Sequence, residues 1–248
     1  SIAAALNGAY GAYCVTFFWN HLSADKETQQ ARMLADAART ANITHVIWST
    51  LEDTRDSIPL EDERMPTLQG KYKVPHFDSK GEADRFFDPA QTTFLLTCFY
   101  WDNLVHFGMG PQPDAEGRLT LTLPMGKAKL SGISSEDIGR CALGIFKRPE
   151  LIGRRVGIAG EHIACSDMAE VLSDVVGRDV IYNAVPASAY RAFGFPGADD
   201  LGNMFQYYEE FEDEFVGRRP IDFANILNPR LQNFRTWAEA NRSALAPA

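Results

Sequence analysis

A chain of 248 residues with 45% hydrophobic and 23% charged residues is long enough for one large domain, or for a domain with a smaller lobe. The net charge of −9 argues against a general affinity for nucleic acid or for an anionic membrane surface. No segment approaches the roughly 20 consecutive apolar residues that a membrane-spanning helix needs, so we expect no membrane partner.

Apolar strands alternate with helices in the first hundred residues. Three runs are continuously apolar and aromatic, as buried parallel strands are: residues 13–19, 44–51 and 92–101. Helical spacing of apolar residues predicts helices at 23–42, behind the capping residue Ser23 or Asp25, and at 76–87. This order predicts an α/β fold, with three adjacent parallel strands and helices on both faces of the sheet.

The segment between the second strand and the second helix reads as a long loop. Residues 53–75 contain three prolines, many charges and few large apolar side chains. Loops of this length inside a compact domain are usually functional or mobile. We therefore expect this loop to be the least ordered internal segment and to cover the ligand as a lid.

The second half predicts a smaller α/β lobe. Expected strands lie at 118–123, 154–163 and 180–186, and expected helices at 134–149, 165–179, 187–195 and 228–245. We interpret residues 1–105 as the sheet domain and residues 106–248 as a smaller substrate or partner lobe that exchanges segments with it.

Cysteine and histidine are dispersed along the chain. The cysteines, Cys14, Cys98, Cys141 and Cys165, each stand alone, which favours buried reduced thiols in a cytoplasmic protein over a disulfide framework. None of the five histidines lies at metal-ligand spacing from another histidine or a cysteine, so we expect no metal.

Several segments together resemble the NmrA-like family, whose members are atypical short-chain dehydrogenase relatives that bind NADP on a Rossmann domain. The matching segments run through nearly the whole chain in order, and include LNGAYGAYCVTFFW, QQARMLADAART, HFDSKGEADRFF, FYWDNL and FGFPGADDLGNMFQYY. The resemblance implies a partial Rossmann-type sheet with NADP as its cofactor. It also implies that residues 13–19 correspond to the family's fourth strand.

Three strands and a glycine-rich GxxGxxG turn precede that strand in the family. No such turn occurs here, because Gly8 and Gly11 come before a strand and do not link a strand to a helix. The resemblance therefore implies a chain without the N-terminal βαβ unit. We expect weak or absent NADP binding by these 248 residues, and self-association through an unpaired edge at residues 13–19.

The nicotinamide end of the site is expected at the carboxyl ends of the strands. The resemblance places cofactor contacts at seven residues: Thr16, Phe17, Phe18, Lys80, Tyr100, Trp101 and Asn103. A surface position for Lys80 and plain packing for Phe17 and Trp101 are the alternatives. In the full-length protein, we expect Lys80→Ala to weaken NADP(H) binding by roughly 1.5–3 kcal/mol without unfolding the domain.

His76 and Lys80 stand four residues apart, so they share a helix face. The pair resembles the YxxxK motif of short-chain dehydrogenases with tyrosine replaced by histidine. His76 is therefore a weak candidate for an acid near neutral pH, against a structural or solvent-facing histidine.

Two functions follow from the resemblance. The first is a redox-state sensor, in which NADP(H) occupancy changes the conformation and the regulatory protein partner bound. The second is an NAD(P)H-dependent reductase acting on a quinone or similar aromatic acceptor. The missing tyrosine favours the sensor, and a chain with no activity of its own is a third possibility.

Overall fold

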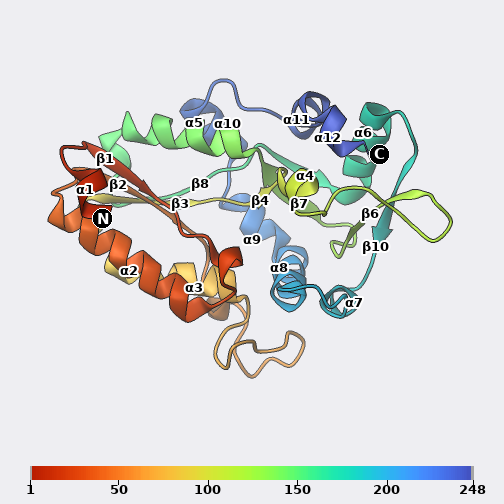
Figure 1. Ribbon diagram of the computed structural model, residues 1–248, viewed down its shortest axis with the longest axis horizontal. Coiled ribbons are helices and arrows are strands. Elements are labelled where there is room, and N and C mark those ends of the chain that lie inside the picture. Colours follow the sequence, from red (N-terminus) through yellow and green to blue (C-terminus); the bar gives the residue numbers. More distant parts are fainter. Residues whose placement is uncertain (1, 247–248) are drawn as a thin grey trace.

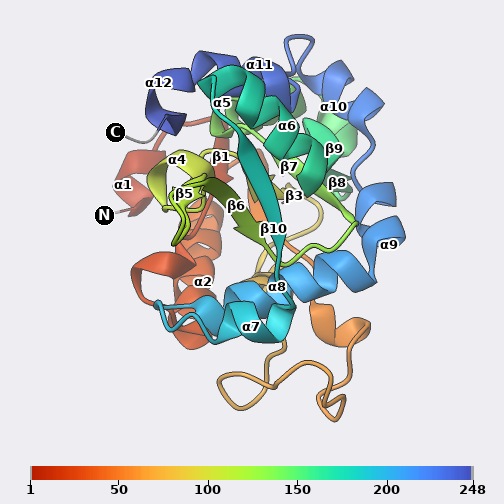
Figure 2. The ribbon, with the colours of Figure 1, turned by 90° about the vertical axis from the view of Figure 1, so that its right-hand side faces the viewer.

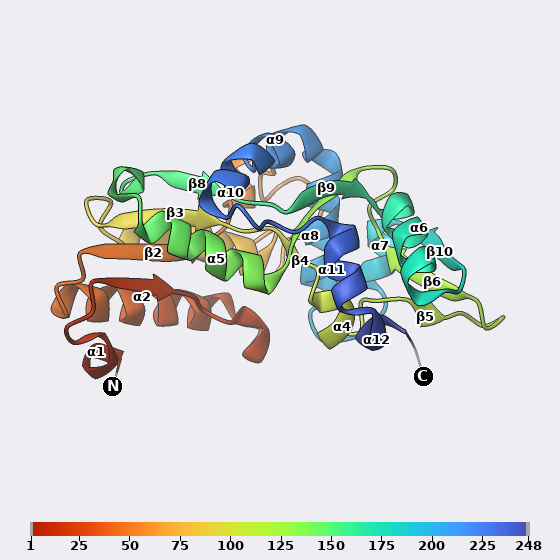
Figure 3. The same cartoon turned by 90° about the horizontal axis from the view of Figure 1, so that it is seen from above.

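The computed structural model describes residues 2–246. Its main sheet has four parallel strands in the order β1-β2-β3-β8. Their bounds are β1 Gly11–Cys14, β2 His45–Thr50, β3 Thr92–Leu96 and β8 Arg155–Gly157. Figure 3 shows the strands side by side, with β1 outermost. The predicted parallel order of the first three strands is confirmed.

Helices cover both faces of this sheet, as the sequence predicts (Figure 1). They are α2 (Ala24–Thr40) and α3 (Pro75–Ala83) on one face and α5 (Ser135–Phe146) on the other. Successive side chains of a strand point to opposite faces. Accordingly, Val46 and Trp48 of β2 pack into a core with alanines of α2, while Ile47 joins a core with Ile145 of α5. Both faces of β2 are therefore buried, which explains its continuously apolar sequence.

Two predicted strands are broken where the chain leaves the main sheet. The run 92–101 forms β3 and then β4 (Phe99–Tyr100), and the run 154–163 forms β8 and then β9 (Glu161–Ala164). Between β3 and β4, the carbonyl of Thr97 accepts a hydrogen bond from Arg219 Nε at 2.8 Å. Strands β4 and β9 pair with β7 (Lys129–Ile133) in a separate sheet. Arg219, which is far away in the sequence, thus binds the chain where β3 ends, although hydrophobicity alone would extend this strand.

The first strand is also shorter than predicted. It ends at Cys14, and Phe18–Asn20 form a 3₁₀ turn. Thr16, Phe17 and Phe18 therefore follow the strand instead of ending it. Among residues 2–246, no strand pairs with the outer edge of β1, so the predicted open edge is present in this chain.

In the second half, β8 and α5 belong to the main sheet and its cover, and we call the elements around β6 and β10, which lie in front of the sheet in Figure 2, the smaller lobe. A three-stranded sheet has the order β10-β6-β5. Its strands are β10 Val180–Ala184, β6 Leu119–Leu123 and β5 Gln112–Pro113. The helices of this half are α4 Asn103–His106, α6 Cys165–Val176, α7 Ala187–Arg191, α8 Ala198–Glu210, α9 Glu212–Gly217, α10 Ile221–Leu227, α11 Phe234–Ala240 and α12 Arg242–Leu245. At the N-terminus, α1 (Ile2–Leu6) packs against α2.

Several features of this half differ from the sequence prediction. Helices α8, α9 and α10 occupy a segment for which the sequence predicts no element, and the predicted C-terminal helix is two helices, α11 and α12. One hydrophobic core runs from Ile47 in β2 to Leu245 in α12. The division of the chain at residue 105 stays a prediction. None of the helices in the described part of the chain is long and apolar enough to cross a membrane.

The loop between β2 and α3 is anchored against α8. Asn203 of α8 donates hydrogen bonds from Nδ2 to the carbonyls of Pro66 and Lys73. The buried Lys73 side chain donates to the carbonyls of Asp62 and Met65 at 2.8 and 2.7 Å. Some side chains of the loop are themselves buried in the interior. The expectation that this loop is the least ordered internal segment took no account of such contacts.

Candidate functional site

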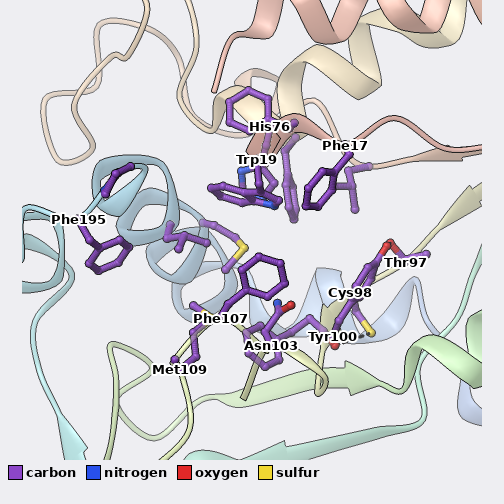
Figure 4. Close-up of a pocket in the computed structure, with 18 of the residues that line it drawn as sticks. Phe17, Trp19, His76, Thr97, Cys98, Tyr100, Asn103, Phe107, Met109 and Phe195 are labelled. Atoms are coloured by element: carbon purple, nitrogen blue, oxygen red, sulfur yellow. Dashed lines mark hydrogen bonds between the residues drawn. The ribbon is translucent and has the colours of Figure 1, made fainter. Parts of the chain in front are cut away.

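A cavity of about 700 Å³ lies at the carboxyl ends of β1, β2 and β3, between the sheet and the smaller lobe. Open α/β sheets bind ligands at this end of their strands. Figure 4 shows Phe17, Trp19 and His76 on one side of the cavity and Tyr100, Asn103 and Phe107 across from them. Seven of the eight residues singled out from the sequence line it: Thr16, Phe17, Phe18, His76, Lys80, Tyr100 and Asn103.

Lys80 is buried against the residues that follow β1. Its Nζ donates to the Thr16 carbonyl at 3.2 Å and to Thr16 Oγ1 at 2.6 Å, and lies 2.7 Å from Glu27 Oε1. Glu27, in the first turn of α2, is completely buried. Burial lowers the pKa of Lys80, and the Glu27 carboxylate opposes that shift. The alternative of a solvated surface lysine is therefore wrong.

The three protons of the Lys80 ammonium group already face three oxygen atoms. A cofactor hydroxyl can bind Lys80 only if one of these contacts is exchanged. The other Glu27 oxygen, Oε2, lies 3.5 Å from His21 Nε2, and neither atom has a hydrogen-bond partner within residues 2–246. The sequence did not identify Glu27, which pairs with residues far from it along the chain.

His76 is paired with a carboxylate from the other lobe. Its ring Nδ1 and its backbone N–H both contact the carboxylate of Asp200, in the first turn of α8. The His76 ring packs against Trp19, with ring centroids 4.8 Å apart. His76 Nε2 has no hydrogen-bond partner among residues 2–246. The alternative of a solvent-facing histidine is wrong, because His76 is only 6% exposed.

The turn before α8 fits closely against the same aromatic cluster. Gly197 precedes the helix with φ of +83°, and a β-carbon there would lie 2.9 Å from the Trp19 ring. Glycine meets both requirements, since it tolerates positive φ and has no side chain. This turn brings Asp200 to His76. The FGFPGADD segment stands out in the sequence, but nothing local shows that its second aspartate meets residue 76.

Across the cavity, Tyr100 and Asn103 provide polar groups. The Tyr100 hydroxyl lies 3.2 Å from Thr97 Oγ1, and burial raises the pKa of Tyr100. Asn103 is the first residue of α4. Both side chains follow the end of β3, as the sequence predicts.

Trp101 does not reach the cavity, which corrects the predicted cofactor contact. Its side chain is fully buried and packs against Phe234 and Trp237. Added β-carbons at Gly132 and Gly160 would lie 2.0 and 2.7 Å from its ring. The two glycines make room for the indole in the core, so the alternative of a packing residue holds.

Aromatic side chains from the smaller lobe form the outer wall of the cavity. Phe107, Phe193 and Phe195 line it and are 58%, 50% and 38% exposed. The sequence analysis did not single them out. Their clustering depends on the fold, because they come from the segment after α4 and from the turn before α8.

The predicted lid is absent from the cavity wall. Of the residues that the structure describes, none between 53 and 75 lines the cavity. The loop lies beneath α8 (Figures 1 and 2). Its contacts with α8 account for this position, and the loop does not cover the cavity in this structure.

The four cysteines are buried and unpaired. Burial raises the pKa of Cys98, which lines the cavity, to about 12. A thiol with such a pKa carries little thiolate at neutral pH, so it is a poor nucleophile. Within residues 2–246, no group of three or more histidine, cysteine, aspartate or glutamate side chains is placed to hold a metal ion.

Comparison with known proteins identifies the family. The sequence model of the NmrA-like family matches residues 1–237. The chain belongs to the NmrA-like family. A curated relative, the "NmrA-like family domain-containing oxidoreductase ptmS" of Penicillium ochrochloron, is 22% identical over 246 residues, which cover 91% of this chain and 69% of the relative. The "Prestalk A differentiation protein A" of Dictyostelium discoideum is 25% identical over 46% of this chain and 43% of its own length.

Solved structures share the fold of this NmrA-like chain. NmrA, a negative transcriptional regulator, in complex with NADP, has a TM-score of 0.74 at 20% identity, over 96% of this chain and 75% of that one. The triphenylmethane reductase of Citrobacter sp. with NADP(H) has a TM-score of 0.68 at 14% identity, over 99% and 78%. An NADPH-dependent quinone oxidoreductase of Escherichia coli has a TM-score of 0.60 at 16% identity, over 92% and 78%. At these identities the likeness concerns the fold.

Polar groups of Thr16, Lys80 and Asn103 and the aromatic ring of Phe17 line the cavity of this NmrA-like chain. These are the kinds of group that could hold the nicotinamide end of a cofactor. No strand-to-helix turn in the 248 residues has the glycine-rich sequence that receives a pyrophosphate.

Proposed function

We propose that this NmrA-like chain is an NAD(P)H-dependent reductase of planar aromatic acceptors such as quinones. The observation that carries the proposal is a cavity in which a few polar groups at the strand ends face walls of aromatic side chains. Its volume of about 700 Å³ leaves space for an acceptor beside a nicotinamide ring. When bound, the cofactor supplies a hydride to the acceptor. In this proposal Phe17 and Phe107, which line the cavity, stack on a planar acceptor, and Thr16 and Lys80 hold the ribose.

The fold relatives include a regulator and two reductases, so fold alone does not choose between them. The missing tyrosine favoured the sensor. His76, which lines the cavity at the corresponding position, now offers an ionisable group in its place. This is why we put the reductase first.

The redox sensor remains the second candidate because of Lys80. Its three protons already face Thr16 and Glu27, so a bound cofactor has to rearrange a contact between α2 and α3. Such a rearrangement would give a regulatory protein partner a structural difference to recognise. The buried, unpaired cysteines suit the reducing cytoplasm, where we place either function.

The reductase proposal is tested by following oxidation of the reduced cofactor at 340 nm with a panel of benzoquinones and naphthoquinones. Because we expect these residues to bind NADP weakly, we expect turnover at high concentrations of NADPH and of reduced nicotinamide mononucleotide. Their kcat/KM values should agree within about tenfold, or 1.4 kcal/mol, because the chain has no glycine-rich turn for the remainder of NADPH. An advantage for NADPH of 3 kcal/mol or more, about two charge-assisted hydrogen bonds, would reveal a phosphate site that we have not assigned. Absence of turnover with the whole panel would reject the reductase.

The open edge of β1 leads to a prediction about self-association. Val15 and Phe17, just beyond this strand, are 48% and 55% exposed. Unpaired strand edges with apolar neighbours tend to pair with another chain. We propose that this chain dimerises through β1, with a sedimentation coefficient that rises with concentration, and that Val15→Lys suppresses the rise. A wild-type chain that stays monomeric over the same concentrations would contradict this proposal.

A further inference from the structure

We propose that His76 is the proton donor of this reduction and that Asp200 is its positioning residue. The inference rests on the proposed reductase function and assigns the source of the proton. It also gives the smaller lobe a role in the chemistry, because His76 comes from α3 beside the sheet and Asp200 from α8 in that lobe.

The geometry fixes the orientation of the imidazole ring. One oxygen of Asp200 contacts ring Nδ1, and the other accepts the backbone N–H of His76 at 3.1 Å. A carboxylate acts only as an acceptor, so the ring atom that faces it is protonated. The rings of Trp19 and Phe77, with centroids 4.8 and 4.7 Å from that of His76, hold the imidazole on its other sides. Nε2 is therefore the ring atom left to act on a ligand.

The arrangement suits proton donation to an oxygen. When a quinone-type acceptor takes up a hydride at one carbonyl oxygen, an O–H bond forms there, and an electron pair and negative charge develop on the other carbonyl oxygen. The Nε2–H bond of the imidazolium breaks as the second O–H bond forms, and the ring becomes neutral. The Nδ1–H stays on Asp200, and water returns a proton to Nε2. The sum is one acceptor, one NAD(P)H and one proton giving the reduced acceptor and NAD(P)⁺.

Other proton donors at the cavity are less well placed. Burial raises the pKa of Tyr100, which weakens its phenol as an acid. The Lys80 ammonium faces Thr16 and Glu27, as described above. Burial raises the pKa of Cys98, so its thiol is a weak acid. The His76 pair combines a fixed ring orientation with a ring nitrogen that has no hydrogen-bond partner among residues 2–246.

The test combines kinetics with a readout that needs no cofactor. Two variants are compared with wild type, each with a matched control. His76→Gln is paired with His106→Gln, which removes an exposed histidine outside the cavity, and Asp200→Asn is paired with Asp199→Asn, which makes the same change one residue earlier. Thermal melting verifies that each is folded. If His76→Gln does not fold, Asp200→Asn carries the test, since it preserves the shape of the side chain.

We expect His76→Gln to lower kcat for quinone reduction by about 100-fold or more with little change in KM, as loss of a proton donor does. Asp200→Asn should lower kcat in the same direction, while the controls remain near wild type. In cofactor-free chain labelled with ¹⁵N-histidine, NMR should show a protonated Nδ1 in His76, and this signature should be lost in Asp200→Asn but kept in Asp199→Asn.

The outcomes separate the inference from the proposed function. A wild-type chain that reduces no acceptor rejects both. An active wild type with an equally active His76→Gln rejects only the proton donor. A slow His76→Gln with an unaffected Asp200→Asn and an unchanged NMR signature rejects the positioning role of Asp200.

Discussion

Replacing Lys80 by alanine is expected to lower the free energy of unfolding by about 3–5 kcal/mol, the usual cost of removing one partner of a buried ion pair. The reason is Glu27, which is completely buried and lies 2.7 Å from Lys80 Nζ. Without the ammonium group, its carboxylate would keep one hydrogen bond, from Thr16 Oγ1. From the sequence we expect this variant not to unfold the protein, because a lysine on a helix face near a cleft carries little core. The burial of Lys80 removes that reason.

Urea denaturation of the wild type and of Lys80→Ala measures this loss. Lys71→Ala is the matched control, because Lys71 is 52% exposed and 3.8 Å from Glu82, and exposed pairs contribute less than about 1 kcal/mol. The double variant Lys80→Met with Glu27→Leu should recover most of the stability, since it leaves no unpaired charge. A loss below about 1 kcal/mol for Lys80→Ala would show that water reaches Glu27 and screens it.

This expectation determines how cofactor binding is tested. If Lys80→Ala binds the cofactor more weakly, the loss could come from the missing ammonium contact or from the disturbed fold. The double variant separates the two effects, because it removes the ammonium group from the cavity and keeps the interior neutral. Its affinity for reduced nicotinamide mononucleotide reports the contribution of Lys80 to the ligand.

Patterns of neighbouring residues predicted the strands and helix caps that depend on those residues alone. Apolar runs identified the strands of the main sheet, and Ser23 caps α2 as its side chain suggests, by accepting a hydrogen bond from Lys26 N. The ends of the strands depend on distant partners. The strand beginning at Thr92 stops near Thr97 because an arginine 122 residues later binds that carbonyl, and no pattern around residue 97 shows this.

Sequence patterns predicted the parts of the site whose residues lie close together in the chain, and missed the parts formed by distant residues. The spacing of His76 and Lys80 on one helix was visible in the sequence, and both side chains line the cavity. Their partners were not visible, because Asp200 is 124 residues from His76 and Glu27 reaches Lys80 from another helix. Trp101 was misplaced since its burial depends on Gly132 and Gly160, which meet it only in the folded chain.

The second large effect is expected at the buried pair of Arg219 and Glu52. Arg219 is completely buried and donates from Nη1 and Nη2 to both Glu52 oxygens, at 2.7 and 2.9 Å. Its Nε binds the carbonyl of Thr97, a residue of the cavity wall, and its guanidinium lies 3.4 Å from the centre of the Phe215 ring. Arg219 thus joins the ends of β2 and β3 to α9. We expect Arg219→Met to lower the free energy of unfolding by about 3–5 kcal/mol.

Arg219→Lys is expected to be destabilising as well, because an ammonium group cannot reproduce the paired contacts of the planar guanidinium. Arg218→Ala is the control, since Arg218 is 46% exposed and 3.9 Å from Glu52.

Burial alone would raise the pKa of Glu52, but Arg219 outweighs it and the pKa is lowered. A lowered folded-state pKa gives stability that is present above the ordinary glutamate pKa and is lost as the pH falls through the folded value. Urea denaturation across this acidic range should therefore show a steeper loss for wild type than for Glu52→Gln, and equal slopes would mean that Glu52 does not depend on Arg219 for its charge.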